Sequence, residues 1–355
     1  MKEIHMNDNR IDWIDYDKAF AIICVVLLHA HIPYPAKGLI EVWVIPLFFF
    51  LSGIFAHANR YSTFRDFFLH KGLHLLIPYL CFNIITYLFW FLAGRHYGYD
   101  AEQDVLWWKP LWGIIYGESS YLTHYVPMWF VACLFSTETL YYLLFRRIQS
   151  TKIYWLMVLG VMVIGGIYYH FNSIALPWGL SSAFSMMVFY AIGAFLSPRI
   201  HNNAFHMWLQ VRNAIPVLIA SLCTVIAVYI VNPGEVEVYK NEYGNYILFY
   251  IGAFAGIIFI SIACKLLEQH MGHISWLSFI GRNTLVILCL HLVMFSCMKG
   301  ITYFIFKLPL ELYEQTWMIL CGSLINIVLL SPIILGINRF FPFITGKFSL
   351  HEKNI

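Results

Sequence analysis

The sequence predicts an all-α membrane protein, a bundle of about ten transmembrane helices with both termini in the cytoplasm. Two features of the composition support this fold class: 60% of the 355 residues are hydrophobic, and only 12% are Asp, Glu, Lys or Arg. In soluble domains roughly 25% of the residues are charged. The third feature is a series of long apolar runs, most of them long enough to cross the hydrocarbon core as a helix. Together these features exclude an ordinary soluble domain.

The apolar runs define the expected helices. Their approximate cores are residues 19–33, 39–57, 73–94, 125–145, 153–170, 179–197, 213–231, 245–264, 276–298 and 316–338. The ninth run contains the polar stretch IGRNT (280–284), so we expect an irregular start to that helix. No internal repeat or long polar segment interrupts the series. We therefore expect one membrane-embedded domain over residues 1–355, with no additional soluble domain.

The distribution of positive charge predicts the orientation. If the N-terminus is cytoplasmic, the outside segments hold only Lys37, Arg95, Lys109, Lys240, Lys299 and Lys307 of the 22 Lys and Arg residues. The remaining 16 (22 minus 6) fall on inside segments, and the bias alternates from loop to loop. Because cytoplasmic loops of membrane proteins are enriched in Lys and Arg, both termini are predicted to be inside.

The first helix, expected within residues 11–35, carries the ionisable residues that most need a functional explanation. At about 100° per residue, Asp15, Lys18 and His29 fall on one stripe, and His31 points to the opposite side. Eleven residues at about 1.5 Å each place His29 roughly 16 Å above Lys18, about half the hydrocarbon thickness. Ionisable groups at membrane depth mark functional sites by default.

The largest outside loop, residues 96–124, combines carboxylates with aromatic side chains. It contains Asp100, Glu102, Asp104, Glu118, Trp107, Trp108, Trp112, Tyr116 and Tyr121. One interpretation is an interfacial aromatic belt. The other is an acceptor site, in which flat rings cover sugar faces and carboxylates accept hydroxyl hydrogens. The spacing does not choose between them.

Five motifs resemble segments of a known family and occur in its order. They are RIDWIDYDKAFAIICVVLLHAH (10–31), IPLFFFLSGIF (45–55), LHLLIPYL (73–80), PMWFVACLF (127–135) and LSFIGRNTLVILCLHLVM (277–294). The chain resembles the integral-membrane acyltransferase 3 family, in particular its fucose 4-O-acetylase-like branch. The resemblance implies transfer of an acyl group, usually acetyl, from cytoplasmic acyl-CoA (acetyl-CoA) to a hydroxyl of a cell-surface or exported carbohydrate.

The family's essential histidine falls on His29. An imidazole that titrates near pH 6.5 is well suited to take a proton from a sugar hydroxyl as it attacks a thioester. His29 is therefore the candidate general base, although a transient acyl-imidazole is an alternative. A histidine that only caps a contact between helices is the structural alternative.

Further residues have less definite roles. Asp15 and Lys18 either orient the first helix and contact the donor, or form a plain ion pair at i and i+3. Ser52 and Trp129 lie in family motifs and are candidate substrate contacts. For Ser52, and for Gly53 beside it, the alternative is a packing role, in which small residues let another backbone approach closely. His291 would support the site from a late helix, or it is simply a buried, hydrogen-bonded histidine.

The donor site departs from the family pattern. Many relatives carry R-x-x-R at the start of the third helix, where this chain has Lys71 and His74. We assign the donor phosphates to Lys71 and His74, with Arg10, Arg65 and Arg282 as further candidates. His70 and His74 are spaced i and i+4, but no third ligand is in register, so no metal is predicted. Glu138 lies inside an apolar run and needs an internal partner that the sequence does not identify.

The expected partners follow from this assignment: a surface polysaccharide or lipid-linked glycan as acceptor, membrane lipids around the bundle, and no nucleic acid. The expected location is the inner membrane of a bacterium. A polysaccharide exporter without acyl transfer is the alternative function, but it would favour inverted repeats and paired broken helices, which the sequence lacks. A non-catalytic interaction protein would leave His29 unexplained.

Overall fold

The computed structural model describes residues 11–56, 61–97, 101, 105–171, 174–201 and 211–347. Within these ranges the chain is built from helices and contains no β-strand. The main helices are α1 (Asp12–His29), α2 (Ala36–Glu41), α3 (Val44–Ile54), α4 (Phe64–Lys71), α5 (Ile77–Leu92), α7 (Lys109–Tyr116), α8 (Trp129–Phe145), α9 (Thr151–Phe171), α10 (Leu180–His201), α12 (Val211–Val231), α13 (Tyr246–Met271), α14 (Ser275–Arg282), α15 (Thr284–Gly300) and α16 (Thr316–Phe340).

Nine helical segments of the described chain are long and apolar enough to cross a membrane. They correspond to the second to tenth predicted runs. Helices α2 and α3 together form the first of these nine segments, and α4 and α5 together form the second. The first predicted helix is α1, whose 18 residues include the charged residues Asp12, Asp15, Asp17 and Lys18. The predicted fold class, an all-α polytopic bundle, is therefore confirmed.

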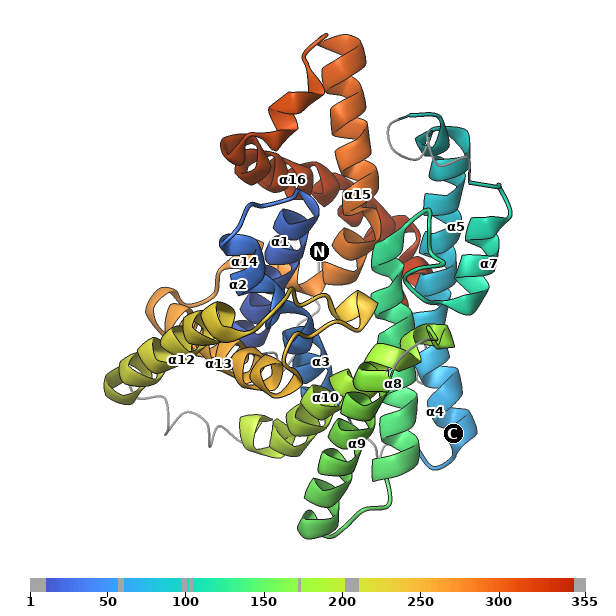
Figure 1. Ribbon diagram of the computed structural model, residues 1–355. Helices are drawn as coiled ribbons and strands as arrows, with labels where there is room; N and C mark the ends of the chain where they lie inside the picture. The colour runs from blue at the N-terminus through green and yellow to red at the C-terminus, as the bar shows by residue number, and fades with distance from the viewer. Residues whose placement is uncertain are drawn as a thin grey trace, which may run out of the picture.

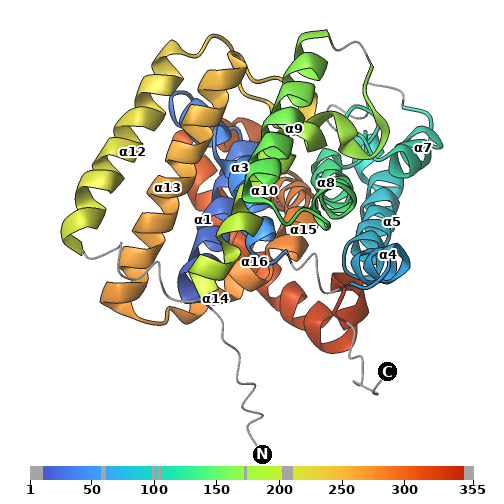
Figure 2. The ribbon, with the colours of Figure 1, turned by 90° about the horizontal axis from the view of Figure 1, so that it is seen from below.

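Helix α1 lies in the interior of the bundle and packs against α3, α13, α14, α15 and α16. In both ribbon views α1 and α3 are surrounded by later helices, while α12 stands at one edge of the molecule and α5 with α7 at another (Figures 1 and 2). Apolar residues such as Ile14, Ile22 and Val26 bury almost all of their surface along α1. This central position brings side chains of α1 within reach of helices from both halves of the chain.

Helices α3 and α10 pack closely because small residues line their contact. A Cβ atom added to Gly53 would lie 2.0 Å from the carbonyl oxygen of Tyr190, and one added to Gly193 would lie 2.1 Å from that of Phe50. Only glycine allows the two backbones to approach so closely. The close approach expected at Gly53 is therefore present.

The break predicted within 280–284 occurs at Asn283. Helix α14 ends at Arg282, Asn283 has a φ of −120°, and α15 begins at Thr284. The Asn283 side chain donates a hydrogen bond to the carbonyl oxygen of Phe279 (2.7 Å) and accepts one from Asn338 of α16 (2.8 Å). The irregular backbone is thus supported by side-chain amides, which also join α14 to the end of α16.

Candidate active site

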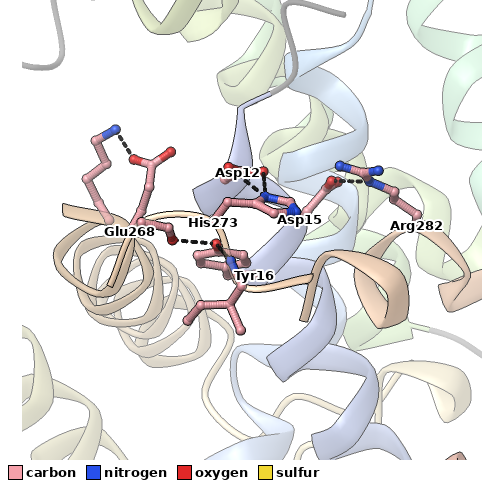
Figure 3. Close-up of polar contacts among 9 residues, drawn as sticks. Asp12, Asp15, Tyr16, Glu268, His273 and Arg282 are labelled. Atoms are coloured by element: carbon pink, nitrogen blue, oxygen red, sulfur yellow. Dashed lines mark hydrogen bonds and ion pairs between the residues drawn. The ribbon is translucent and has the colours of Figure 1, made fainter. Parts of the chain in front are cut away.

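The N-terminal end of α1 is fixed by the turn between α13 and α14 (Figure 3). The His273 ring lies 3.0 Å from the Asp12 carboxylate, and the Tyr16 hydroxyl donates a hydrogen bond to the carbonyl oxygen of Gly272 (2.8 Å). Arg282 Nε lies 2.9 Å from Asp15 Oδ2. The sequence suggested Lys18 as the partner of Asp15, but the structure pairs Asp15 with Arg282, from the other end of the chain. Lys18 Nζ lies 4.7 Å from the centre of the Phe55 ring.

A cavity of about 800 Å³ lies beside this end of α1. Its polar lining residues are Asp15, Lys18, Ser52, Arg282, Asn283, Thr284, Asn338 and Lys347. We call the part around Lys18, Arg282 and Lys347 the cationic end. All three cations lie on segments that the charge distribution assigns to the cytoplasm. The cationic end is therefore suited to an anion that approaches from that side.

The rest of the cavity is apolar and follows two helices towards their far ends. On α1, Lys18 is followed along the stripe by Ile22 and Val25, and on α15 the lining residues are Leu285 and Leu288. His29 is four residues beyond Val25, and His291 is three residues beyond Leu288, so each lies about one turn further along its helix. The cavity thus leads from the cationic end towards these two histidines.

His29 and His291 face each other, with ring centroids 4.9 Å apart and ring planes inclined at 48°. His291 is completely buried, and its Nδ1 lies 3.0 Å from the carbonyl oxygen of Ile287 and 2.9 Å from that of Leu288. Tyr125 completes the group, because its hydroxyl donates to the same Leu288 carbonyl oxygen at 2.9 Å. The stripe residue His29 and the late-helix residue His291, both selected from the sequence, are therefore brought together.

His31 lies beyond the end of α1, not on its opposite face. The helix ends at His29, and His31 is exposed with a φ of 62°. The prediction that His31 points to the opposite side assumed about 100° of helical rotation per residue, which does not apply beyond the end of the helix. His31 remains separate from the pair formed by His29 and His291 because the chain has already turned out of the helix.

Trp129 is buried between the cavity wall and the segment that joins α12 to α13. Its ring centroid lies 6.3 Å from that of Phe130, which lines the cavity, and 6.4 Å from that of Tyr239. The Tyr239 hydroxyl donates to Glu237 (3.2 Å). Of the predicted substrate contacts, Ser52 lies at the cavity and Trp129 lies behind its wall.

Of the four acidic residues predicted for an acceptor site, Glu118 is within the part of the chain that the structure describes. Asp100, Glu102 and Asp104 lie outside the described residues. Glu118 is buried and accepts hydrogen bonds from Ser119 and Ser120. Ser119 also donates to the carbonyl oxygen of Tyr239 (2.7 Å). Glu118 therefore helps to hold its loop against the segment that joins α12 to α13.

The predicted donor residues do not come together at one site. Lys71 forms an ion pair with the buried Glu138 at 3.0 Å, which supplies the internal partner that Glu138 requires, and both line a separate pocket of about 90 Å³. His74 lies against the backbone at Gly346, next to Lys347. Arg65 is exposed on α4, and Arg10 lies outside the described residues. Of the five predicted cations, Arg282 alone lines the large cavity in the described part of the chain.

Several residues of the site have no signal in the sequence. Lys347 donates a hydrogen bond to Asn338 (2.8 Å), which in turn contacts Asn283, and this chain of amides places the lysine at the cationic end. Tyr125 precedes the PMWF motif by two residues, and nothing in the sequence marks it as a site residue. Lys347 contributed to the positive-inside count, but its position over the cavity depends on how the end of α16 folds back. Within the described ranges, no three His, Cys, Asp or Glu side chains are placed to hold a metal ion.

The fold and the site define an integral, multi-pass membrane protein with two adjacent histidines, His29 and the buried His291, beyond a cation-lined cavity. A family model described as an acyltransferase domain matches residues 11–336. The chain therefore belongs to the acyltransferase 3 family and is a membrane acyltransferase. Neither the curated proteins nor the solved structures gave a significant match.

Proposed function

We propose that the protein is an O-acyltransferase, most simply an O-acetyltransferase, which moves an acyl group from cytoplasmic acyl-CoA to a hydroxyl of a surface or exported carbohydrate. The observation that carries the proposal is the cavity that runs from the cationic end along one stripe of α1 towards His29. A fucose 4-O-acetylase-like enzyme in the inner membrane of a bacterium is the specific form of this proposal.

The cationic end suits the phosphates of coenzyme A. Arg282 presents a planar guanidinium that can bind a phosphate through two parallel hydrogen bonds, even though one of its nitrogens contacts Asp15. Lys18 and Lys347 add two flexible positive charges. Beyond them, Ile22, Val25 and Leu288 offer an apolar path for the pantetheine arm and the acyl group. His74, beside Lys347, is a further donor contact in this proposal.

His29 is placed to act as the general base at the far end of this path. The acceptor hydroxyl gives its proton to the imidazole as its oxygen attacks the thioester carbon, and the carbon–sulfur bond then breaks. The imidazolium returns the proton to the departing thiolate. The products are an acyl ester and free coenzyme A, so protons and electrons balance without a metal or an oxidant.

The acceptor would approach from the opposite side of the membrane. Trp129 and Tyr239 are aromatic side chains on that side of the cavity wall, and Glu237 is a nearby carboxylate. Ring faces and carboxylates are the groups that proteins offer to sugar rings and hydroxyls. These three side chains therefore support a carbohydrate as the acceptor.

The proposal can be tested with the purified chain in lipid nanodiscs, radiolabelled acetyl-CoA, and total surface carbohydrate from cells that lack the protein. We expect label to pass to the carbohydrate. Lys18→Gln should raise the KM for acetyl-CoA about tenfold or more, because it removes a charged hydrogen-bond donor. Lys152→Gln, at an exposed lysine on α9, is the matched control and should leave KM unchanged. Equal effects of both substitutions, or no transfer by the unaltered protein, would contradict the proposal.

A further inference from the structure

His291 carries a buried nitrogen without a hydrogen-bond partner. The side chain has no exposed surface, and within the described residues its Nε2 has neither a donor nor an acceptor in range. Leaving a buried polar atom without a partner costs folding free energy, because the atom has lost its hydrogen bonds to water. An unsatisfied buried polar atom in a native protein calls for an explanation, and a catalytic role is one of them.

The surroundings of His291 define which nitrogen carries the hydrogen. Nδ1 lies within hydrogen-bond distance of two carbonyl oxygens, those of Ile287 and Leu288, which can only accept. The Tyr125 hydroxyl gives its own hydrogen to Leu288 and therefore cannot donate to Nδ1. Nδ1 must then be protonated, and in a neutral imidazole this leaves Nε2 as a lone-pair acceptor.

The His291 ring is also held in place from α16. The Asn326 side chain, which is fully buried, donates a hydrogen bond to the backbone carbonyl oxygen of His291 at 2.9 Å. With Nδ1 engaged on its own helix, the ring has little freedom to turn. Two titratable side chains lie next to the His291 ring: His29, with a ring centroid 4.9 Å away, and Tyr125, with its hydroxyl 3.4 Å from Nδ1. The χ2 torsion of His29 has broad wells, so the ring can turn its N–H group relative to Nε2 at little cost.

We propose that His291 is the positioning residue for His29. Its Nε2 accepts a hydrogen bond from an N–H group of His29, which fixes the tautomer of His29 and leaves the other His29 nitrogen free to act as the base. This inference rests on the proposed function. During transfer, the acceptor O–H bond breaks and its proton joins the free His29 nitrogen. The imidazolium is then stabilised by the Nε2 lone pair until the proton passes to the thiolate.

In this arrangement the base, His29, is oriented by a second side chain, His291, which is a neutral imidazole and not a carboxylate. A neutral partner orients the ring without neutralising the positive charge. The imidazolium is therefore stabilised less than it would be beside a carboxylate, and it gives up its proton more readily. This property suits a reaction in which the same proton must leave again within one turnover.

The test compares His291→Ala and His291→Gln in the nanodisc assay, with acetyl-CoA as donor and total surface carbohydrate as acceptor. Alanine removes the acceptor nitrogen, so kcat should fall about 100-fold while the KM for acetyl-CoA stays within about twofold. Glutamine keeps an acceptor oxygen, so it should restore part of kcat. His170→Gln, at an exposed histidine of α9, is the matched control and should retain full kcat.

The double variant decides whether His291 acts through His29. If it does, adding His291→Ala to His29→Asn should slow the reaction no further, because residues that work as one unit show non-additive losses. Losses that multiply, or an unchanged kcat in His291→Ala, would overturn the inference while leaving the acyltransferase proposal intact. Absence of transfer by the unaltered protein would overturn both.

Discussion

Arg282 Nε lies 2.9 Å from the carboxylate of Asp15, and this ion pair joins the N-terminal end of α1 to the end of α14 beside the cavity. The Asp15 side chain is 12% exposed and the Arg282 side chain 38%. The same contact therefore stabilises the fold and sets the position of a proposed phosphate ligand. The two roles can be separated by experiment.

Arg282→Gln should destabilise the protein by about 1–3 kcal/mol, because it leaves the mostly buried Asp15 carboxylate without its cation. Adding Asp15→Asn should recover most of that stability but none of the lost affinity for acetyl-CoA. Thermal unfolding in detergent and the KM for acetyl-CoA are the two measurements. A double variant as unstable as Arg282→Gln would mean that the ion pair does not stabilise the bundle.

The contact between α3 and α10 gives a prediction about stability alone. Gly53→Ala should strongly lower the melting temperature, because the new Cβ atom would lie 2.0 Å from a backbone oxygen that belongs to a packed helix. Gly160→Ala is the matched control, since a Cβ atom there meets no atom within 4 Å. In a helix, alanine is favoured over glycine by roughly 1 kcal/mol, so this variant should be as stable as the unaltered protein or more so. Similar melting temperatures for both variants would refute the packing argument.

His124 gives a prediction about pH. Burial lowers the pKa of this imidazole from about 6.5 to about 4, although the nearby backbone of Asn83 acts in the opposite direction. The unfolded chain binds a proton at His124 below about pH 6.5, whereas the folded protein does so only near pH 4. The folded state should therefore lose up to about 3 kcal/mol as the pH falls from 6.5 to 4.

Melting temperatures measured from pH 7 to pH 4 would show this effect. The unaltered protein should lose more stability over that range than His124→Phe, which has no proton to bind. His170→Phe, at an exposed histidine, should behave like the unaltered protein. Parallel curves for all three proteins would show that His124 does not contribute to acid sensitivity.

The predicted orientation can be tested by thiol labelling. A cysteine introduced at Glu235, in the exposed segment between α12 and α13, should react with a membrane-impermeant maleimide on intact cells. A cysteine at Lys152 should react only after the membrane is opened, because the charge distribution places it inside. The reverse pattern would place the cationic end of the cavity on the side of the membrane that lacks acyl-CoA.

The helices and much of the candidate site could be predicted from the sequence because both depend on local patterns. Apolar runs fix the spans, and a helical repeat places Asp15, Lys18 and His29 on one stripe whatever the surrounding fold. The polar stretch around Asn283 likewise marked the break before α15. These inferences need no knowledge of which helices are neighbours.

The remaining features depend on contacts between distant segments. The pairing of Asp15 with Arg282, and of Lys71 with Glu138, is decided by how helices pack, and several cations were available to each carboxylate. Lys347 reaches the cavity only because the chain after α16 folds back over it. The His31 prediction assumed a longer helix, whereas α1 ends at His29 and the chain turns.

The central claim is that His29 removes the proton from the acceptor hydroxyl, and the turnover number of His29→Asn tests it most directly. His31→Asn is the control, because asparagine tolerates the positive φ of that position. With saturating acetyl-CoA and surface carbohydrate in nanodiscs, His29→Asn should lower kcat at least about 100-fold with an unchanged melting temperature, and His31→Asn should lose much less. Near-normal turnover in a folded His29→Asn protein would contradict the account.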